Sequence, residues 1–166
     1  MQYKFPSISS EGFVPVNSYR RAIVLASLCA AAAALSFLII PFYEWKLHFF
    51  QLGIFLAGFV FGPFSGALAG AASSAYNGLF ILHNPYIIAG NALLGFFGAY
   101  FYTRHGALKA ALLAFAIQAP YVWITDIYLV HMPQPAVIGI LETLLATNII
   151  CAAVAGYFAP SVAKGA

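Results

Sequence analysis

The sequence predicts an all-α integral membrane protein, a six-transmembrane-helix bundle with both ends of the chain in the cytoplasm. Hydrophobic residues make up 63% of its 166 positions and charged residues only 7%, whereas soluble domains carry about 25% charged residues. Helix-breaking residues divide the apolar chain into six segments of roughly membrane-spanning length. Lysine and arginine residues gather on one side of these segments. Together the three observations exclude a water-soluble domain.

Each expected span ends at a proline, a glycine or a short polar stretch, the residues that stop helices. The spans are Ala22–Ile40, Leu47–Phe61, Pro63–Leu82, Pro85–Tyr102, Ala107–Val130 and Ala136–Phe158. In the same order, they end at Pro41, Gly62-Pro63, His83-Asn84-Pro85, Thr103-Arg104-His105-Gly106, His131-Met132-Pro133-Gln134-Pro135 and Pro160. A helix needs about 20 apolar residues to cross the hydrocarbon core, so the short second span is expected to tilt or to thin the lipid around it.

The orientation follows from the basic residues beside the membrane ends. With the N-terminus in the cytoplasm, only Lys46 of the seven lysine and arginine residues falls outside. The cytoplasmic residues are Lys4, Arg20, Arg21, Arg104, Lys109 and Lys164. We therefore expect a multi-pass protein of the cell membrane: a cytoplasmic extension over residues 1–19, a membrane domain over 20–160 and a cytoplasmic tail over 161–166.

Two ridges of small residues recur at four-residue spacing. In lipid, helices associate through close backbone approach, which favours glycine, alanine and serine at contacts. The third span carries a ridge that is expected to pack helices together, formed with Ser74 by Gly62, Gly66, Gly70 and Gly78. The first span carries Ala22, Ala26, Ala30 and Ala34. This alanine ladder either packs inside the monomer or meets another subunit.

Polar side chains gather in roughly the outer third of the spans, measured at about 1.5 Å per residue. They are Gln51, Asn77, Asn91, Trp123, Asp126 and Glu142. Asp126 and Glu142 are the only acidic residues inside spans. A charge at the bilayer centre costs about 2.5–3.5 kcal/mol, so such residues usually face a protein interior or a water-filled cavity. The pattern predicts a small-molecule pocket that opens to the outside.

The alternative to a pocket is hydrogen bonding between helices with no ligand, which would account for Asn77 and Asn91. Asp126 lies near enough to the membrane surface for headgroup water to solvate it.

Several motifs of other function classes are absent from the sequence. It contains no HExxH metal pair, no GxSxG nucleophile elbow and no GxxxxGK[ST] phosphate loop. No lysine and arginine cluster is dense enough for nucleic acid. Cys29 and Cys151 stand alone in apolar segments and are read as inert packing residues. We expect neither an enzyme nor a bound metal or cofactor.

The alanine ladder, the stretch LGIFLAGFVFGPFSGALAG at residues 52–70 and the compact six-span chain resemble the substrate-binding (S) components of energy-coupling factor (ECF) vitamin transporters. The resemblance implies a protein that binds a vitamin or related micronutrient from outside. It also implies a transmembrane coupling subunit and two ATPase subunits as partners, with docking through Ala26, Ala30 and Ala34. By the same resemblance the ligand contacts Trp123, Asp126, Glu142, Asn91 and Asn77, gated by the loops Pro41–Lys46, Leu82–Pro85 and His131–Pro135.

The chemistry of the candidate pocket narrows the class of ligand that it could bind. Two carboxylates favour a positive charge or several hydrogen-bond donors, and Trp123 suits a flat heterocycle. A structural or assembly subunit with no ligand is the alternative function. An intramembrane enzyme using Asp126 and Glu142 as an acid/base pair is disfavoured, because no nucleophile or metal set accompanies them.

Overall fold

The computed structural model describes residues 18–42 and 45–165 of the chain. The elements within these ranges are α1 (Ser18–Leu35), β1 (Ile39–Phe42), β2 (Trp45–His48), α2 (Gln51–Phe61), α3 (Pro63–Tyr76), the π-helical turn η1 (Asn77–Ile81), α4 (Tyr86–His105), α5 (Ala107–Ile124), the π-helical turn η2 (Thr125–Leu129) and α6 (Gln134–Gly165). The expected all-α class is confirmed, with one short hairpin added. Lys4 and all but the last two residues of the expected 1–19 extension lie outside the described ranges.

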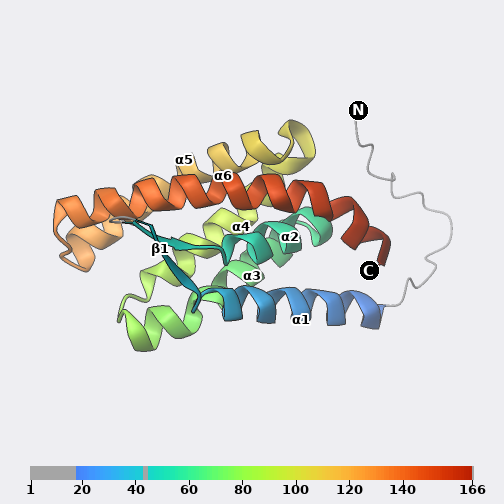
Figure 1. Cartoon of the computed structure of the whole chain (residues 1–166), viewed down its shortest axis with the longest axis horizontal. Helices are drawn as coiled ribbons and strands as arrows, with labels where there is room; N and C mark the ends of the chain where they lie inside the picture. The colour runs from blue at the N-terminus through green and yellow to red at the C-terminus, as the bar shows by residue number, and fades with distance from the viewer. Residues whose placement is uncertain (1–17, 43–44, 166) are drawn as a thin grey trace.

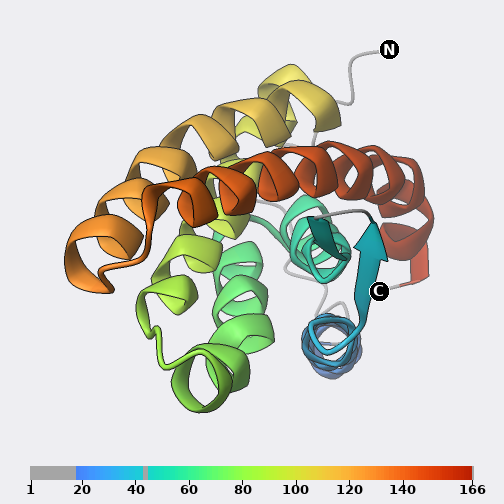
Figure 2. The ribbon, with the colours of Figure 1, turned by 60° about the vertical axis from the view of Figure 1, so that its left-hand side comes forward.

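The helices form a bundle around α2, which packs against α1, α3, α4 and α6. Figure 1 shows α6 running along nearly the whole bundle beside α5, while the start of α1 and the end of α6 lie at the same end. In Figure 2, α5 and α6 run together along one side and α1 lies on the opposite side. The apolar core consists of small and large side chains from α2, α4, α5 and α6, including Phe55, Leu94 and Ala155.

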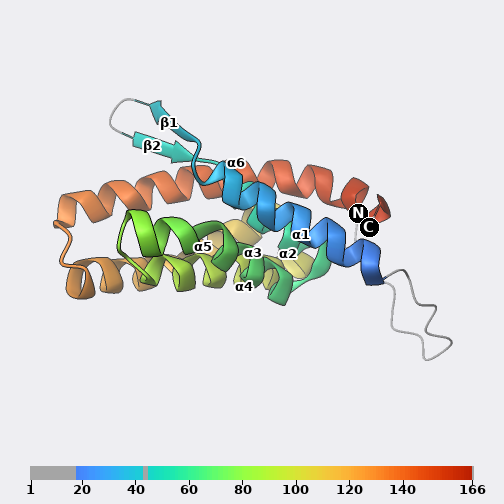
Figure 3. The ribbon, with the colours of Figure 1, turned by 90° about the horizontal axis from the view of Figure 1, so that it is seen from below.

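A β-hairpin replaces the end of the first expected span and the start of the second, so their predicted bounds are wrong there. The first helix ends at Leu35 rather than Ile40, and α2 begins at Gln51 rather than Leu47. Between them β1 and β2 pair antiparallel, from Ile39 opposite His48 to Phe42 opposite Trp45. Ile40 precedes a proline and is β-branched, and both properties disfavour a helix. The hairpin stands at the edge of the bundle, and β2 packs against α6 (Figure 3).

The last helix also extends beyond the end predicted from the sequence. It was expected to end at Phe158, but α6 continues through Pro160 to Gly165 and takes in most of the expected tail. Proline holds φ near −65°, which is a helical value, so the helix continues at the loss of one backbone hydrogen bond.

The glycine ridge of the third span packs α3 against α4. A Cβ atom added at Gly66 would meet the carbonyl of Gly95, and one added at Gly70 would meet the carbonyl of Asn91. A Cβ atom added at Gly78 would lie 3.0 Å from the carbonyl oxygen of Asn84, a less severe contact than at Gly66 or Gly70. Gly62 is different, since it joins α2 to α3 at a φ of 98° and has open space around its Cα. Its role is conformational, because a residue with a Cβ is strained at that φ.

The helical hairpins α3–α4 and α5–α6 turn in the same way. After η1, the N–H of Leu82 donates to the carbonyl of Asn77 and the N–H of Asn84 to that of Gly78, both at 2.8 Å. After η2, the bonds from Val130 to Thr125 (2.9 Å) and from Met132 to Asp126 (2.8 Å) repeat the arrangement.

The sequences of the two turns correspond residue by residue: NGLFILHNP over 77–85 and TDIYLVHMP over 125–133. Each places a histidine in the left-handed region, His83 at a φ of 50° and His131 at 60°. In each turn the chain remains hydrogen-bonded up to the proline that ends the turn. The turns therefore hold their polar side chains, Asn84 and Asp126, on defined backbone rather than on loose loops.

Candidate binding site

An outer pair of polar side chains joins the two turns. Nδ2 of Asn84 donates to Oδ1 of Asp126 at 2.8 Å, and Oδ1 of Asn84 accepts from the backbone N–H of Tyr86 at 3.2 Å. Both side chains are buried, with 3% of Asn84 and 5% of Asp126 exposed. The hydroxyl of Tyr121 also donates to the carbonyl of Tyr86, at 3.2 Å. These bonds fix one carboxylate oxygen of Asp126 and leave Oδ2 without a hydrogen bond to the described residues.

An inner group of amides links α4, α5 and α6. Nε2 of Gln118 donates to the carbonyl of Gly90 at 3.2 Å and to Oδ1 of Asn91 at 3.3 Å. Oε1 of Gln118 accepts from Nδ2 of Asn148 at 3.4 Å. The side chains of Gln118, Asn91 and Asn148 are all buried, so each bond forms away from bulk solvent, where an unmade hydrogen bond is costly.

The two levels are separated along antiparallel helices. Asp126 lies eight residues beyond Gln118, and Asn91 seven residues beyond Asn84. At about 1.5 Å per residue, the levels are about 10–12 Å apart. That spacing matches the long dimension of a small organic molecule.

A cavity of about 750 Å³ lies between these levels. Its polar lining includes His48, Asn84, Tyr86, Asn91, Gln118, Thr125, Asp126, Glu142 and Thr143. Its apolar walls include Phe50, Ile87, Val122, Val130, Ile138 and Leu144. The volume falls within the range of small-molecule sites, about 300–1,000 Å³. Another hollow among the described residues, beside Gly62 and Arg104, measures only about 130 Å³.

The cavity contains three of the six side chains expected at a ligand: Asn91, Asp126 and Glu142. Glu142 is exposed and makes no hydrogen bond or ion pair with the part of the chain that the structure describes. Among the described residues of the lining, Asp126 and Glu142 are the acidic ones, and none is a lysine or an arginine.

The other three expected residues, Asn77, Gln51 and Trp123, do not line this cavity. Nδ2 of Asn77 donates to the carbonyl of Ser36 at 3.2 Å and to its Oγ at 3.0 Å, which ties η1 to the end of α1. Gln51 donates to Oγ1 of Thr147 at 3.0 Å and joins α2 to α6. Trp123 is half-buried on α5 and is absent from the cavity wall. Depth along a helix says nothing about which face a side chain occupies, and these three lie on other faces.

Sequence reasoning assigned no ligand role to Asn84 or Thr143. Asn84 belongs to the helix-stopping stretch His83-Asn84-Pro85 and to the expected gate loop Leu82–Pro85. In the structure, the backbone N–H of Asn84 donates to the carbonyl of Gly78 and holds Asn84 against the bundle. The matching stretches NGLFILHNP and TDIYLVHMP do not pair the two residues, because Asn84 corresponds to Met132 and Asp126 to Gly78. Only the folded structure brings Asn84 beside Asp126.

The alanine ladder occupies the outward face of α1. Ala22, Ala26, Ala30 and Ala34 are all exposed. The opposite face packs inward, where the buried Ala32 lies so close to Gly53 of α2 that a Cβ on that glycine would overlap it. The bundle therefore does not use the ladder for its own packing.

Comparison with known proteins was made from both the sequence and the structure. No protein-family model matches the chain, and no curated protein matches it. The fold and the site define a helical bundle with a polar cavity near one end. A solved structure has the same fold, with a TM-score of 0.69. That structure is the S component of a bacterial ECF transporter. The match has 21% sequence identity and covers 89% of this chain and 97% of that one. The protein thus has the fold of an ECF S component, as the sequence resemblance implied.

Proposed function

We propose that this protein is the substrate-binding subunit of an ECF-type transporter, which captures a small micronutrient from outside and passes it on chemically unchanged. The observation that supports it best is the cavity of about 750 Å³ between the Asn84–Asp126 pair and the Gln118–Asn91 amides. It combines apolar walls with a few fixed polar groups, which is the usual composition of a small-molecule site. The likeness of the whole fold to an S component supports the same function.

A multi-pass position in the cell membrane is part of the proposal. Among the described residues, Ala107–Leu129 and Gln134–Gly165 are long and apolar enough to cross a bilayer. Large apolar side chains lie exposed on the outside of several helices, as Phe64, Leu112 and Tyr157 do. Such a surface suits lipid.

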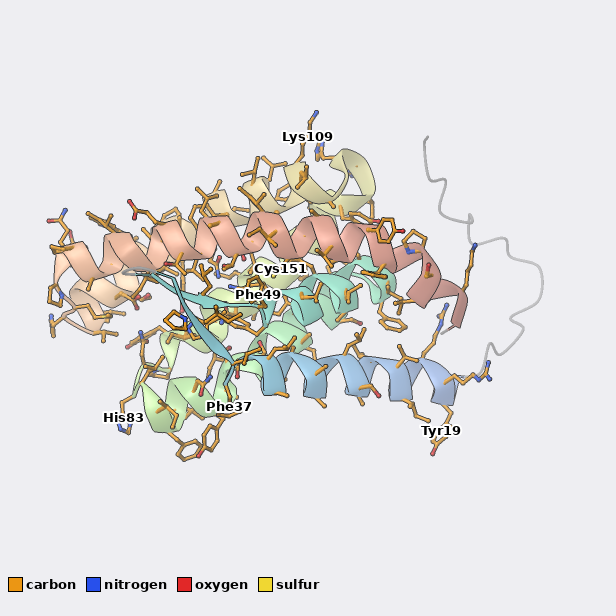
Figure 4. All side chains as sticks on the ribbon, viewed as in Figure 1. Tyr19, Phe37, Phe49, His83, Lys109 and Cys151 are labelled. Carbon is orange, nitrogen blue, oxygen red and sulfur yellow. The ribbon has the colours of Figure 1, made fainter. Side chains whose placement is uncertain are left out.

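The orientation of the bundle is proposed as N-in and C-in with six crossings. Arg20 and Arg21 lie at the start of α1 and Lys164 at the end of α6, and these two helix ends lie together in Figure 1. In Figure 4, Tyr19 and His83 lie at opposite ends of the bundle. The cavity includes Leu82 and Asn84, next to His83, and so lies toward the end away from the arginines of α1. With basic residues facing the cytoplasm, the cavity faces outward.

The alanine ladder of α1 is proposed as the docking face for a transmembrane coupling subunit, which two ATPase subunits would drive. Small side chains at four-residue spacing let another helix approach closely in lipid. The exposure of Ala22, Ala26, Ala30 and Ala34, together with inward packing through Ala32, supports this role.

Native mass spectrometry of the purified full chain tests the function. We expect a single small organic molecule to remain bound and to be lost on denaturation. A protein that carries no small molecule, and that binds none from a mixture of water-soluble vitamins, would contradict the proposal. A tightly bound protein in place of a small molecule would instead favour an assembly subunit.

A further inference from the structure

We infer that the ligand of this cavity is an organic cation that lies with its charge toward the outer acidic level and a hydrogen-bond acceptor toward Asn91. The inference rests on the proposed function and goes beyond it by giving the charge class and the orientation of the ligand. It follows from the geometry of the two hydrogen-bonded levels, from the sign of the lining charges and from Nδ2 of Asn91, which has no hydrogen bond to the described residues.

The two carboxylates lie at a similar height in the cavity. Asn148 is bonded to Gln118, which sets the inner level on both α5 and α6. Glu142 precedes Asn148 by six residues and Asp126 follows Gln118 by eight. At about 1.5 Å per residue, these offsets place Glu142 about 9 Å and Asp126 about 12 Å outward of the amides. Both carboxylates therefore lie at the outer end of one cavity.

The charge of this end selects against anions. Among the described residues, the lining contains two carboxylates, one histidine (His48) and no lysine or arginine, and its walls are largely apolar. In such surroundings a ligand carboxylate or phosphate would be desolvated with no lysine or arginine of the described lining to pair with, and it would be repelled by Asp126. A positively charged group is the complementary partner, because Asp126 keeps Oδ2 without a hydrogen bond to the described residues and Glu142 makes none.

The cation is organic rather than a metal ion. No group of three histidine, cysteine, aspartate or glutamate side chains able to hold a metal ion occurs among the described residues. A cavity of about 750 Å³ with walls such as Val122 and Ile138 also far exceeds the size of a single ion. Apolar walls of this size fit a carbon-rich ligand.

The inner end offers one defined donor. The carbonyl of Gly90 can only accept, so the group of Gln118 that faces it must be Nε2. The same Nε2 donates to Oδ1 of Asn91, which leaves Nδ2 of Asn91 with no hydrogen bond to the described residues. Since Asn91 lines the cavity, this N–H group is available to an acceptor on the ligand, such as a ring nitrogen or a carbonyl.

The test combines identification of the bound molecule with binding measurements on the full-length protein in detergent. The molecule released by denaturation is identified by mass spectrometry. Binding of thiamine (cationic), riboflavin (neutral), and biotin and pantothenate (anionic) is then measured by native mass spectrometry and thermal shift. We expect the released molecule to be a cation, and the protein to bind a cation in preference to the neutral and anionic probes.

The variants Asp126→Asn and Glu142→Gln should each weaken binding of the released molecule about tenfold or more, because each removes a charge partner. Asp126→Glu and Glu142→Asp keep the charge and should retain more affinity than the amide variants. Asn91→Leu should weaken binding, whereas Gln134→Leu, which removes an exposed amide outside the cavity, should not.

The outcomes separate the inference from the proposed function. A neutral or anionic natural ligand, or affinity unchanged in the Asp126→Asn and Glu142→Gln double variant, would overturn the inference and leave a binding subunit in place. Unchanged affinity in Asn91→Leu would overturn the inferred orientation of the ligand in the cavity. A protein that carries and binds no small molecule at all would overturn the proposed function itself.

Discussion

The amide of Asn84 holds the carboxylate of Asp126 at 2.8 Å, across a sequence separation of 42 residues. One residue follows the first π-helical turn and the other lies within the second, so the bond joins the ends of the two helical hairpins. Asn84 is itself held by the backbone N–H of Tyr86. A buried carboxylate is stable only with such partners, and this one keeps its second oxygen available to the cavity.

Replacing Asn84 with leucine should lower both stability and ligand affinity. The change leaves a buried charged group without its donor, an effect of about 1–3 kcal/mol or more. Thermal unfolding in detergent measures the first effect and titration with the released ligand the second. In the double variant with Asp126→Asn, the stability loss should be smaller than the sum of the two single losses. Fully additive losses would mean that the bond contributes nothing.

Substituting Gly66 with alanine should destabilise the bundle by driving α3 away from α4. The new Cβ would fall on the carbonyl of Gly95, which belongs to rigid helix backbone. Overpacking of this kind costs about 1–3 kcal/mol. Gly165→Ala is the control, since nothing lies within 4 Å of its Cβ position. Equal unfolding temperatures for the two variants would contradict the packing described for this ridge.

A large side chain on the alanine ladder should separate docking from ligand binding. Ala30→Trp places bulk on the exposed face of α1, away from the cavity. Ligand affinity should stay at the level of the original protein, while co-purification with a co-expressed coupling subunit should be lost. Leu113→Trp, on an exposed face of α5, is the matched control. Co-purification retained in Ala30→Trp would place docking elsewhere.

Trp123 provides a test of where the binding site lies. The sequence pointed to it as a stacking surface, but it does not line the cavity. Trp123→Leu should therefore change ligand affinity much less than Asp126→Asn does, when both are measured by the same titration. A strong loss of affinity in Trp123→Leu would restore the stacking role and contradict the site geometry.

The N-in, six-span topology predicts which positions react with a thiol reagent that does not cross membranes. With Cys29 and Cys151 replaced by alanine, a cysteine at His83 should be labelled in intact cells. A cysteine at Lys109 should be labelled only after the membrane is opened. In the proposed topology, position 83 lies on the outer side of the membrane and position 109 on the cytoplasmic side. The reverse pattern would invert the orientation, and labelling of both in intact cells would contradict an odd number of crossings between them.

Several features of the fold follow from local sequence and were predicted correctly. Pro63 begins α3, and Gly106 separates α4 from α5, as the breakers indicated. The predicted boundaries were wrong within Ile39–His48, where the ends of two expected helices are strands instead. Short apolar segments are compatible with either a strand or a helix. The predicted boundary was wrong again at Pro160, where a single proline did not outweigh the helix around it.

Local sequence properties were enough to establish that this chain is apolar and helical, that Asp126 and Glu142 lie within helical segments, and that an alanine ladder runs along its first helix. Composition, helix breakers and four-residue spacing suffice for these properties because each acts locally or additively. The packing of the folded chain was needed to show that Asn84 lies beside Asp126, that Asn77 is hydrogen-bonded to Ser36 and that Trp123 lies off the cavity wall. Which face of a helix meets a cavity depends on the packing and rotation of every neighbouring helix, and on the extra residue that each π-helical turn inserts.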